Sequence, residues 1–326
     1  MAIHAWPGSR IVATFFLLAA LLSGSCLAAD AFSPEKLLTT WRDNEKSHSN
    51  SCITWRASLR APLSPADVEI AKLKKQPIPP IDARDAADLP ASLKISGDKY
   101  RFTTIAFRST ANVFTKAVPL VTAYDSKVRY TLMDGALGLP ARGAMDLQPA
   151  SHSAREGSML APNLLFRPFV SGLFSKDAKP RVAGKPVAVD GRLCFPVLFP
   201  SNDATLSLRI WADCETLFPV QLQSHRETGL HRETFLEATV TLKYNGIPRP
   251  ESLLEWEYSL YSSGNRLMET ASAQRIEVHR DCEVNDKDFT IDYPAGTHVA
   301  DKRSGEVLEL ISQGNGELVP RPKPSK

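Results

Sequence analysis

The chain carries little net charge and, after its N-terminal segment, no long apolar run, and each shortage excludes a class of protein. The formal net charge is +3 over 326 residues. No block of Lys and Arg is interleaved with aromatic residues, so we expect no nucleic-acid partner. No later stretch is apolar enough to cross a bilayer, which takes about 20 residues. We therefore expect no transmembrane span in the mature chain.

The sequence also lacks the motifs of several enzyme classes. It has no Gly-x-Ser-x-Gly elbow, no His-Glu-x-x-His zinc helix and no glycine loop that would cradle a phosphate. Ser33 and Lys36 fit a bare Ser-x-x-Lys pattern, but a helix cap explains them better. Glu255 and Glu257 share one strand face, where solvated carboxylates are common. We predict a protein that is not an enzyme, with no catalytic residue, no metal and no cofactor.

The N-terminus has the pattern of a signal peptide over residues 1–29. Arg10 precedes the apolar run Ile11–Leu22, and small residues follow. Twelve residues at about 1.5 Å each reach about 18 Å, which is too short for a stable span. Cys26 offers a lipid anchor as an alternative, but Ser23 stands where lipidation favours Leu. We expect an exported, periplasmic or extracellular, soluble protein.

The cysteines that remain after cleavage are even in number, as expected for disulfides in an exported chain. They are Cys52, Cys194, Cys214 and Cys282. Two disulfides are the favoured interpretation, with three connectivities left open, and free buried thiols are the alternative. A hairpin of Leu193–Phe199 with Ala204–Trp211 would place Cys194 opposite Arg209, about 17 Å from Cys214 at strand rise.

Apolar and polar residues alternate through most of the chain, which predicts antiparallel strands with one buried face. The alternation is clearest in Cys52–Arg60 and from Ala204 to Tyr293, where one expected inward set is Leu254, Trp256, Tyr258 and Leu260. Two hairpins are expected, one turning at Gly97–Asp98 and one around Asp125–Lys127. We predict a mainly antiparallel β protein with a few helices (α+β), in which a curved, half-open β-barrel covers short helices.

The segments between the expected strands predict short helices, a surface insertion and loops. Ser33-Pro34-Glu35 predicts the start of a helix that fades near Ser47. Residues 61–90 are proline-rich and are expected to form a surface insertion, and Gly135–Gly157 a long loop. Pro162 and Pro168 limit Met159–Phe174 to short helical turns. We expect one domain over residues 32–312 and a flexible tail over 313–326.

Three segments share a pattern with a known family. Asp288–Asp301 contains Phe-x-x-x-x-Pro-x-Gly-x-x-Val, Ile95–Phe102 contains a Gly-Asp-Lys-aromatic hairpin, and Ala123–Tyr130 contains a second hairpin. In these segments the chain resembles the periplasmic lipoprotein-carrier superfamily, which includes outer-membrane lipoprotein-sorting proteins and related exported bacterial proteins. The resemblance implies an unclosed antiparallel barrel over helices, an apolar concave face that holds acyl chains, and no catalytic residues.

A metal site is suggested at first sight by a repeated His-Arg-Glu-Thr motif. This doublet consists of His225-Arg226-Glu227-Thr228 and His231-Arg232-Glu233-Thr234. A turn at Gly229–Leu230 would pair Glu227 with Arg232 and Arg226 with Glu233. The two imidazoles would then point to opposite faces, so we interpret the doublet as a charged hairpin tip.

Aromatic and apolar side chains on the dry strand positions are the remaining candidates for a site. Either they form an ordinary core, or they line an apolar cleft. The candidate lining residues are Trp55, Phe102, Leu242, Trp256 and Tyr258. Our leading hypothesis is a non-enzymatic extracytoplasmic binding or carrier module for an apolar small molecule, a lipid or a lipidated protein. The alternatives are an extracytoplasmic hydrolase of cell-envelope or extracellular polymer, and a structural envelope protein.

Overall fold

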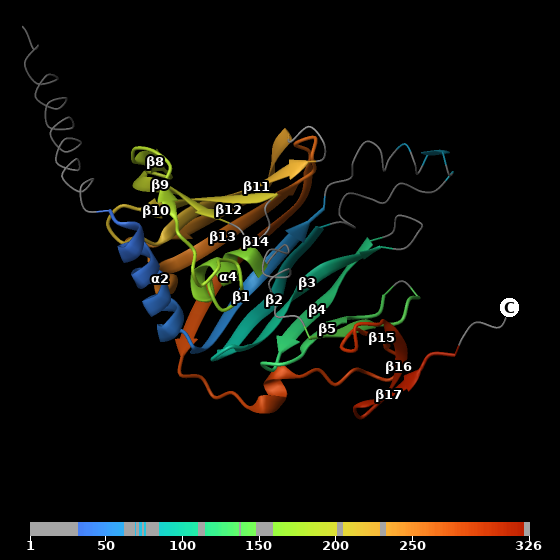
Figure 1. The fold of residues 1–326 in the computed structure, drawn as a ribbon. Coiled ribbons are helices and arrows are strands. Elements are labelled where there is room, and N and C mark those ends of the chain that lie inside the picture. The colour runs from blue at the N-terminus through green and yellow to red at the C-terminus, as the bar shows by residue number, and fades with distance from the viewer. Residues whose placement is uncertain are drawn as a thin grey trace, which may run out of the picture.

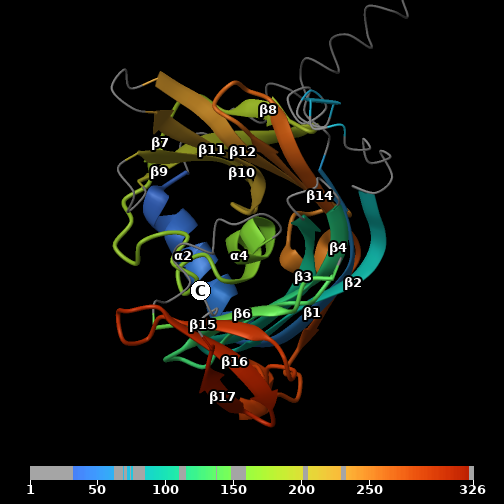
Figure 2. The same ribbon diagram turned by 90° about the vertical axis from the view of Figure 1, so that its right-hand side faces the viewer.

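The fold is an open antiparallel sheet that bends around two helices, as the computed structural model shows (Figures 1 and 2). The structure describes residues 32–61, 69, 72–73, 75, 85–109, 115–136, 138–147, 159–200, 205–228 and 233–322. Within these residues one 17-stranded sheet accounts for all the strands. The predicted fold class is confirmed.

The strands are β1 (Asn50–Arg60), β2 (Asp85–Ser96), β3 (Lys99–Ser109), β4 (Thr115–Tyr124), β5 (Arg129–Met133), β6 (Arg142–Asp146), β7 (Arg181–Val182), β8 (Val187–Val189), β9 (Arg192–Pro200), β10 (Leu206–Asp213), β11 (Pro219–Thr228), β12 (Glu233–Tyr244), β13 (Leu253–Tyr261), β14 (Leu267–Arg280), β15 (His298–Asp301), β16 (Leu308–Gly314) and β17 (Glu317–Pro320). The helices are α2 (Pro34–Ser47) and α4 (Leu160–Phe166), with the 3₁₀ turns η5 (Pro250–Ser252) and η6 (Asp286–Phe289).

Strand β1 lies at the centre of the sheet and joins its two halves. It pairs with β2 on one side and with β14 on the other. One half then continues from β2 through β3, β4 and β5 to β6, and the other from β14 back through β13, β12, β11 and β10 to β9. Strand β15 adds to the edge at β6, in the one parallel pairing among the described strands.

The apolar alternation correctly predicts which strand face is buried, with one local error. Leu208, Leu222 and Val240 are completely buried, as expected. Leu254, however, is 54% exposed, and Leu253 is buried in its place. The register between β12 and β13 shifts after Lys243, so the alternation predicted for the start of β13 is one residue out of phase.

The two helices lie on the concave side of the sheet (Figure 2). Helix α2 begins as predicted, because the Ser33 hydroxyl accepts a hydrogen bond from the Lys36 amide at 3.0 Å and Pro34 occupies the first turn. Helix α4 is short, as its prolines require, and every one of its residues is buried. Together with the inner face of the sheet, the helices form the main core.

The C-terminal segment builds a second, smaller core around Met145 and Tyr293. Its close packing needs a glycine: a Cβ on Gly143 would lie 2.3 Å from the Tyr293 ring. Gly143 belongs to β6, so the expectation that Gly135–Gly157 is entirely loop is wrong for residues 142–146. Likewise, residues 85–90 of the predicted insertion belong to β2, and residues 317–320 of the predicted tail form β17 because Leu318 packs on this second core.

One disulfide joins Cys52 on β1 to Cys282 just after β14, and Cys194 and Cys214 are free thiols. The prediction of two disulfides is therefore wrong. The predicted register was wrong too, since Cys194 lies opposite Asp213 rather than Arg209. The Cys214 amide donates to the Leu193 carbonyl, so the two cysteines are neighbours although no disulfide joins them.

Several predictions concern residues outside the described ranges. These are the signal peptide over residues 1–29 with Cys26, most of the insertion at 61–90, the turn at Gly229–Leu230, and the last four residues of the tail. Among the described residues, no helix combines the length and the apolarity needed to cross a bilayer.

Candidate ligand-binding site

The five predicted lining residues meet inside the curved sheet. Trp55, Phe102, Leu242, Trp256 and Tyr258 are all at most 3% exposed and belong to the main core. The rings of Trp55 and Trp256 are 4.9 Å apart between centroids, and those of Trp55 and Phe102 are 5.7 Å apart. Leu242 lies directly opposite Trp256 on the neighbouring strand. The alternation thus correctly predicts that these positions are buried, and their role as the lining of a ligand site stays a prediction.

Small residues on β14 allow these rings to meet. Ala273 lies opposite Ala57 on β1 and opposite Trp256 on β13, so no bulky side chain separates the aromatic residues of the two strands. Two of the five residues also border pockets. Trp55 is part of the lining of a pocket of about 430 Å³, and Tyr258 of one of about 440 Å³. The core therefore comes close to solvent at these two points.

Helix α2 covers the other end of the core through one large side chain. Trp41 stacks on Phe199 with ring centroids 5.3 Å apart and planes 5° from parallel. Its indole Nε1 donates a 2.8 Å hydrogen bond to the Leu217 carbonyl. Only Leu37 and Trp41, of the 14 residues in the helix, are buried. The helix is thus attached to the core along a narrow stripe.

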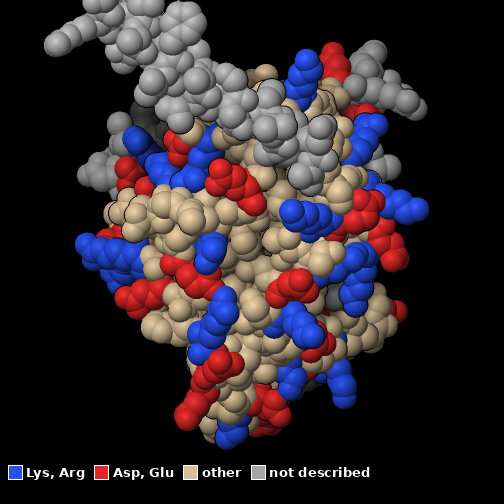
Figure 3. All heavy atoms as spheres, turned by 90° about the vertical axis from the view of Figure 1, so that its left-hand side faces the viewer, with Lys and Arg blue, Asp and Glu red and all other residues tan. Residues whose placement is uncertain are grey.

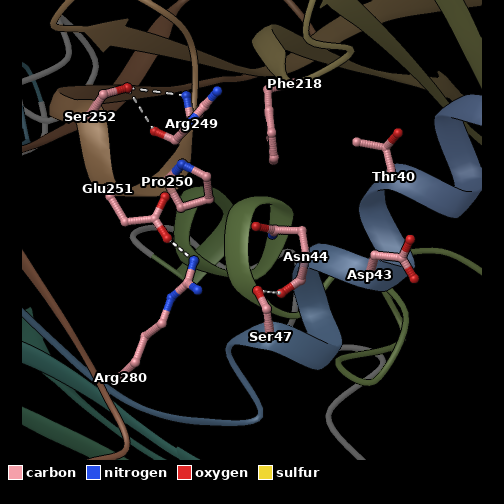
Figure 4. A pocket seen from close by; sticks show the side chains of 10 residues that line it. All are labelled: Thr40, Asp43, Asn44, Ser47, Phe218, Arg249, Pro250, Glu251, Ser252 and Arg280. Carbon is pink, nitrogen blue, oxygen red and sulfur yellow. Dashed lines mark hydrogen bonds and ion pairs between the residues drawn. The ribbon is translucent and has the colours of Figure 1, made fainter.

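A cleft of about 640 Å³ lies between the adjoining flank of α2 and the sheet. Its α2 wall consists of Thr40, Asp43, Asn44 and Ser47, and its other walls are Phe218, Arg249, Pro250, Glu251, Ser252 and Arg280. In Figure 4, the Phe218 ring and Asn44 point into the space between the helix and η5. One wall is therefore aromatic and the others are polar, which suits a ligand with both an apolar and a polar part.

The polar wall is held by a chain of charges. Arg280 forms an ion pair with Glu251, and the Nε2 atom of His48 lies 3.4 Å from the same carboxylate. Burial lowers the pKa of His48, although the Asn44 carbonyl and Glu251 oppose this shift. Burial also acts to raise the pKa of Glu251, but its own backbone amide and Arg280 outweigh burial and lower it. An ionised Glu251 held by Arg280 is therefore the stable arrangement.

Ser47 and His48 are in contact at this cleft, as in a serine hydrolase, but their geometry is that of a helix end. Ser47 Oγ lies 3.1 Å from His48 Nδ1, and it also donates to the Asn44 carbonyl at 2.8 Å. His48 Nδ1 is 2.9 Å from that same carbonyl, which only a protonated nitrogen can approach favourably. A protonated Nδ1 cannot take the Ser47 proton. His48 is also completely buried, away from any substrate.

The face that carries α2 has no charge of one sign over a wide area. Figure 3 shows Lys and Arg interspersed with Asp and Glu across this side. Arg249 is exposed at the cleft. Recognition there would depend on local contacts rather than on a long-range field.

The other polar candidates are structural. Glu255 and Glu257 both face Lys243, at 3.4 and 3.2 Å, on the solvated side of the sheet. In the doublet, Arg226 lies opposite Phe235 instead of Glu233, and its side chain pairs with Glu237. The difference is already present at the tip, where Thr228 pairs with Glu233 and not with His231. His231 and Arg232 lie outside the described residues.

Neither metal binding nor thiol chemistry finds support in the described part of the chain. There, no group of three or more His, Cys, Asp and Glu side chains is placed to hold a metal ion. Burial raises the pKa of Cys194 to about 12 and that of Cys214 to about 11, so both stay protonated and unreactive.

Sequence reasoning missed the cleft because its walls come from four distant segments. Phe218, η5 and Arg280 approach α2 only after the sheet has curved. The one local signal was Arg249-Pro250-Glu251-Ser252, where a proline after a strand indicates a turn that presents polar side chains.

No known family profile matches the chain, and no curated protein matches it. Among solved structures, it is similar to a LolA superfamily protein from Nitrosomonas europaea, at 10% identity and TM-score 0.44 over 81% of this chain and 100% of that one. It is similar to an outer membrane lipoprotein-sorting domain from Vibrio parahaemolyticus, at 10% identity and TM-score 0.46 over 79% of this chain and 97% of that one. It is also similar to a DUF1329 family protein from Desulfovibrio piger, at 9% identity and TM-score 0.37 over 78% of this chain and 96% of that one. All three are at most 10% identical to this chain, so function has to be argued from this chain's own residues.

Proposed function

We propose that the protein is a non-enzymatic, exported binding or carrier module that holds an apolar ligand, or the lipid part of a lipidated partner, between the concave face of its sheet and helix α2. The observation that carries this proposal is the cleft beside α2. It leaves one flank of the helix free of the sheet, while the adjoining flank covers an aromatic core.

Few contacts hold α2 in place. Its buried contacts are those of Leu37 and Trp41, each worth about 2–3 kcal/mol. A few polar bonds add to them, such as Asn44 Nδ2 to the Leu165 carbonyl at 2.7 Å. Moving α2 outward would extend the cleft onto Phe174 and Phe199, which stack with Trp41. An apolar ligand that replaces the lost contacts can offset this cost.

In that open state, the five predicted residues would lie deeper in the site, with Leu242, Trp256 and Tyr258 on strands that α4 contacts. Trp55, Phe102, Leu242, Trp256 and Tyr258 form a continuous apolar surface beyond the residues that α2 covers. An acyl chain suits such a surface because it needs no hydrogen-bond partner, and polar groups at the cleft can hold its head group.

Fluorescence quenching tests where the ligand lies. Addition of dibromostearate should quench Trp55 and Trp256, because bromine quenches indoles that it contacts, while unbrominated stearate should not. The Trp55→Phe/Trp256→Phe double variant should lose most of the effect. Trp211→Phe is the matched control, since Trp211 lies on the outer face beside Arg209. Quenching that disappears only in Trp211→Phe would refute the proposal.

The contact between Ser47 and His48 makes a hydrolase the second candidate. That function requires a nucleophilic Ser47, which a fluorophosphonate probe would label. We expect no labelling that depends on Ser47, because its hydroxyl is bound to the Asn44 carbonyl. Labelling that is lost in Ser47→Ala would favour the hydrolase.

A further inference from the structure

A buried arginine beside α4 has no carboxylate in direct contact among the described residues. Arg167 is 2% exposed, and no carboxylate of the described residues forms an ion pair with it. Its guanidinium lies 4.4 Å from the centre of the Tyr100 ring and donates one hydrogen bond, to the Asp98 carbonyl. Its Nε is buried without a hydrogen-bond partner. Glu45 and Asp98 act on this guanidinium only through space. Because buried charges in proteins are normally paired, an anion in direct contact would stabilise it.

A pocket of about 240 Å³ lies next to this guanidinium. Arg167 is part of its lining, and so is Gly97, which adjoins the Asp98 carbonyl that binds Arg167. Two further cations, Arg42 and Lys46 of α2, line the same pocket. The guanidinium therefore lies at one wall of a space with positive groups on other sides.

One carboxylate lines the pocket, and it is already engaged. Glu45 Oε1 accepts hydrogen bonds from the amides of Phe169 and Val170, at 3.0 and 2.8 Å. The three cations and Glu45 leave a formal excess of two positive charges. A phosphate monoester carries about −1.5 to −2 and three acceptor oxygens, so it matches this excess better than a carboxylate does.

We infer that the pocket between α2, α4 and the β2–β3 turn is a phosphate-binding site, in which Arg167 is the buried ligand and Lys46 and Arg42 close the rim. The apolar side chains of Ile95, Phe166 and Val170 line the rest of the pocket, so the phosphate can carry an apolar substituent. Free phosphate and the head group of a phosphomonoester lipid are the two sources of this chemistry. The site does not depend on the proposed apolar ligand.

Calorimetric titration with inorganic phosphate, at constant ionic strength in chloride, tests the site. Lys46→Gln and Arg42→Gln should each weaken binding about tenfold, because each removes a charge-assisted contact. Lys36→Gln is the matched control: it removes an exposed lysine from the other end of the same helix and should leave the affinity unchanged. Arg167→Met should abolish binding.

A second titration, with dihexanoyl phosphatidic acid, distinguishes the sources. Affinity at least tenfold above that of inorganic phosphate identifies a lipid head group, and equal affinity identifies free phosphate. If Arg167→Met fails to fold, the rim variants decide. The inference is overturned if the unmodified protein binds neither probe, or if Lys46→Gln and Arg42→Gln bind phosphate as Lys36→Gln does. Failure here leaves quenching by dibromostearate unaffected, so the two proposals fail separately.

Discussion

The attachment of α2 can be weakened by one substitution at its central contact, Trp41→Phe. The phenyl ring keeps most of the stacking on Phe199 but loses the 2.8 Å hydrogen bond to the Leu217 carbonyl. The lost bond should cost about 1 kcal/mol, and the smaller ring about 1 kcal/mol more. The closed state is therefore destabilised by about 2 kcal/mol relative to an open one.

This shift has a measurable effect on ligand binding. At 1.4 kcal/mol for each factor of ten, 2 kcal/mol raises the open population about 30-fold. The apparent dissociation constant of an apolar ligand that binds only the open state falls by the same factor, as long as the closed state still dominates. Titration with the fluorescent probe N-phenylnaphthylamine measures this constant directly.

The control is the same substitution away from α2. Trp211→Phe changes a partly exposed indole on the outer face and should leave the affinity for the probe unchanged. If Trp41→Phe lowers the free energy of unfolding by about 2 kcal/mol while probe affinity stays constant, then α2 does not control access, and our reasoning about the cover is wrong.

Three further predictions concern stability. Cys52→Ala breaks a disulfide that spans 230 residues of sequence, so the free energy of unfolding in urea should fall by about 3–5 kcal/mol, and reductant should have the same effect on the unmodified protein only. Gly143→Ala places a methyl group against the Tyr293 ring and should lower the free energy of unfolding by about 2–3 kcal/mol. Gly264→Ala is the control: its methyl group meets nothing closer than 4.0 Å, so it should change the free energy of unfolding by less than about 0.5 kcal/mol. Equal effects of the two substitutions would contradict the packing argument. Burial lowers the pKa of His48, so the unfolded chain binds this proton at a higher pH than the folded protein does. The free energy of unfolding should therefore fall as the pH drops below about 6.5. His48→Gln should flatten that part of the pH profile, and an unchanged profile would contradict this prediction.

The sequence predicts the sheet far better than it predicts the cleft. Alternation identifies the inner faces of β1 and β13 correctly because successive side chains of a strand point alternately to the core and to solvent. The end of α2 near Ser47 is likewise a local property. Register is different. The shift after Lys243 that buries Leu253, and the pairing of Cys194 with Asp213, depend on how neighbouring strands twist and end.

Sites made by tertiary contact were the least predictable. Nothing in the composition around Phe218 or Arg280 connects them to α2, since the curvature of the whole sheet brings them together. The aromatic cluster was predictable because its members occupy alternate strand positions that face the same side of the sheet. Alternation, however, indicates only which side of the sheet a residue faces. Whether that face is open or covered depends on α4, whose short apolar sequence could have packed on either side.

We propose that α2 covers a place where an apolar molecule is held. Native mass spectrometry of the protein, purified from its own host without detergent, tests this claim most directly. We expect a species heavier than the protein by the mass of one lipid-sized ligand, and a larger share of that species when ligand is added to Trp41→Phe. Protein that shows its bare mass alone, both as purified and after incubation with stearate, would contradict this proposal.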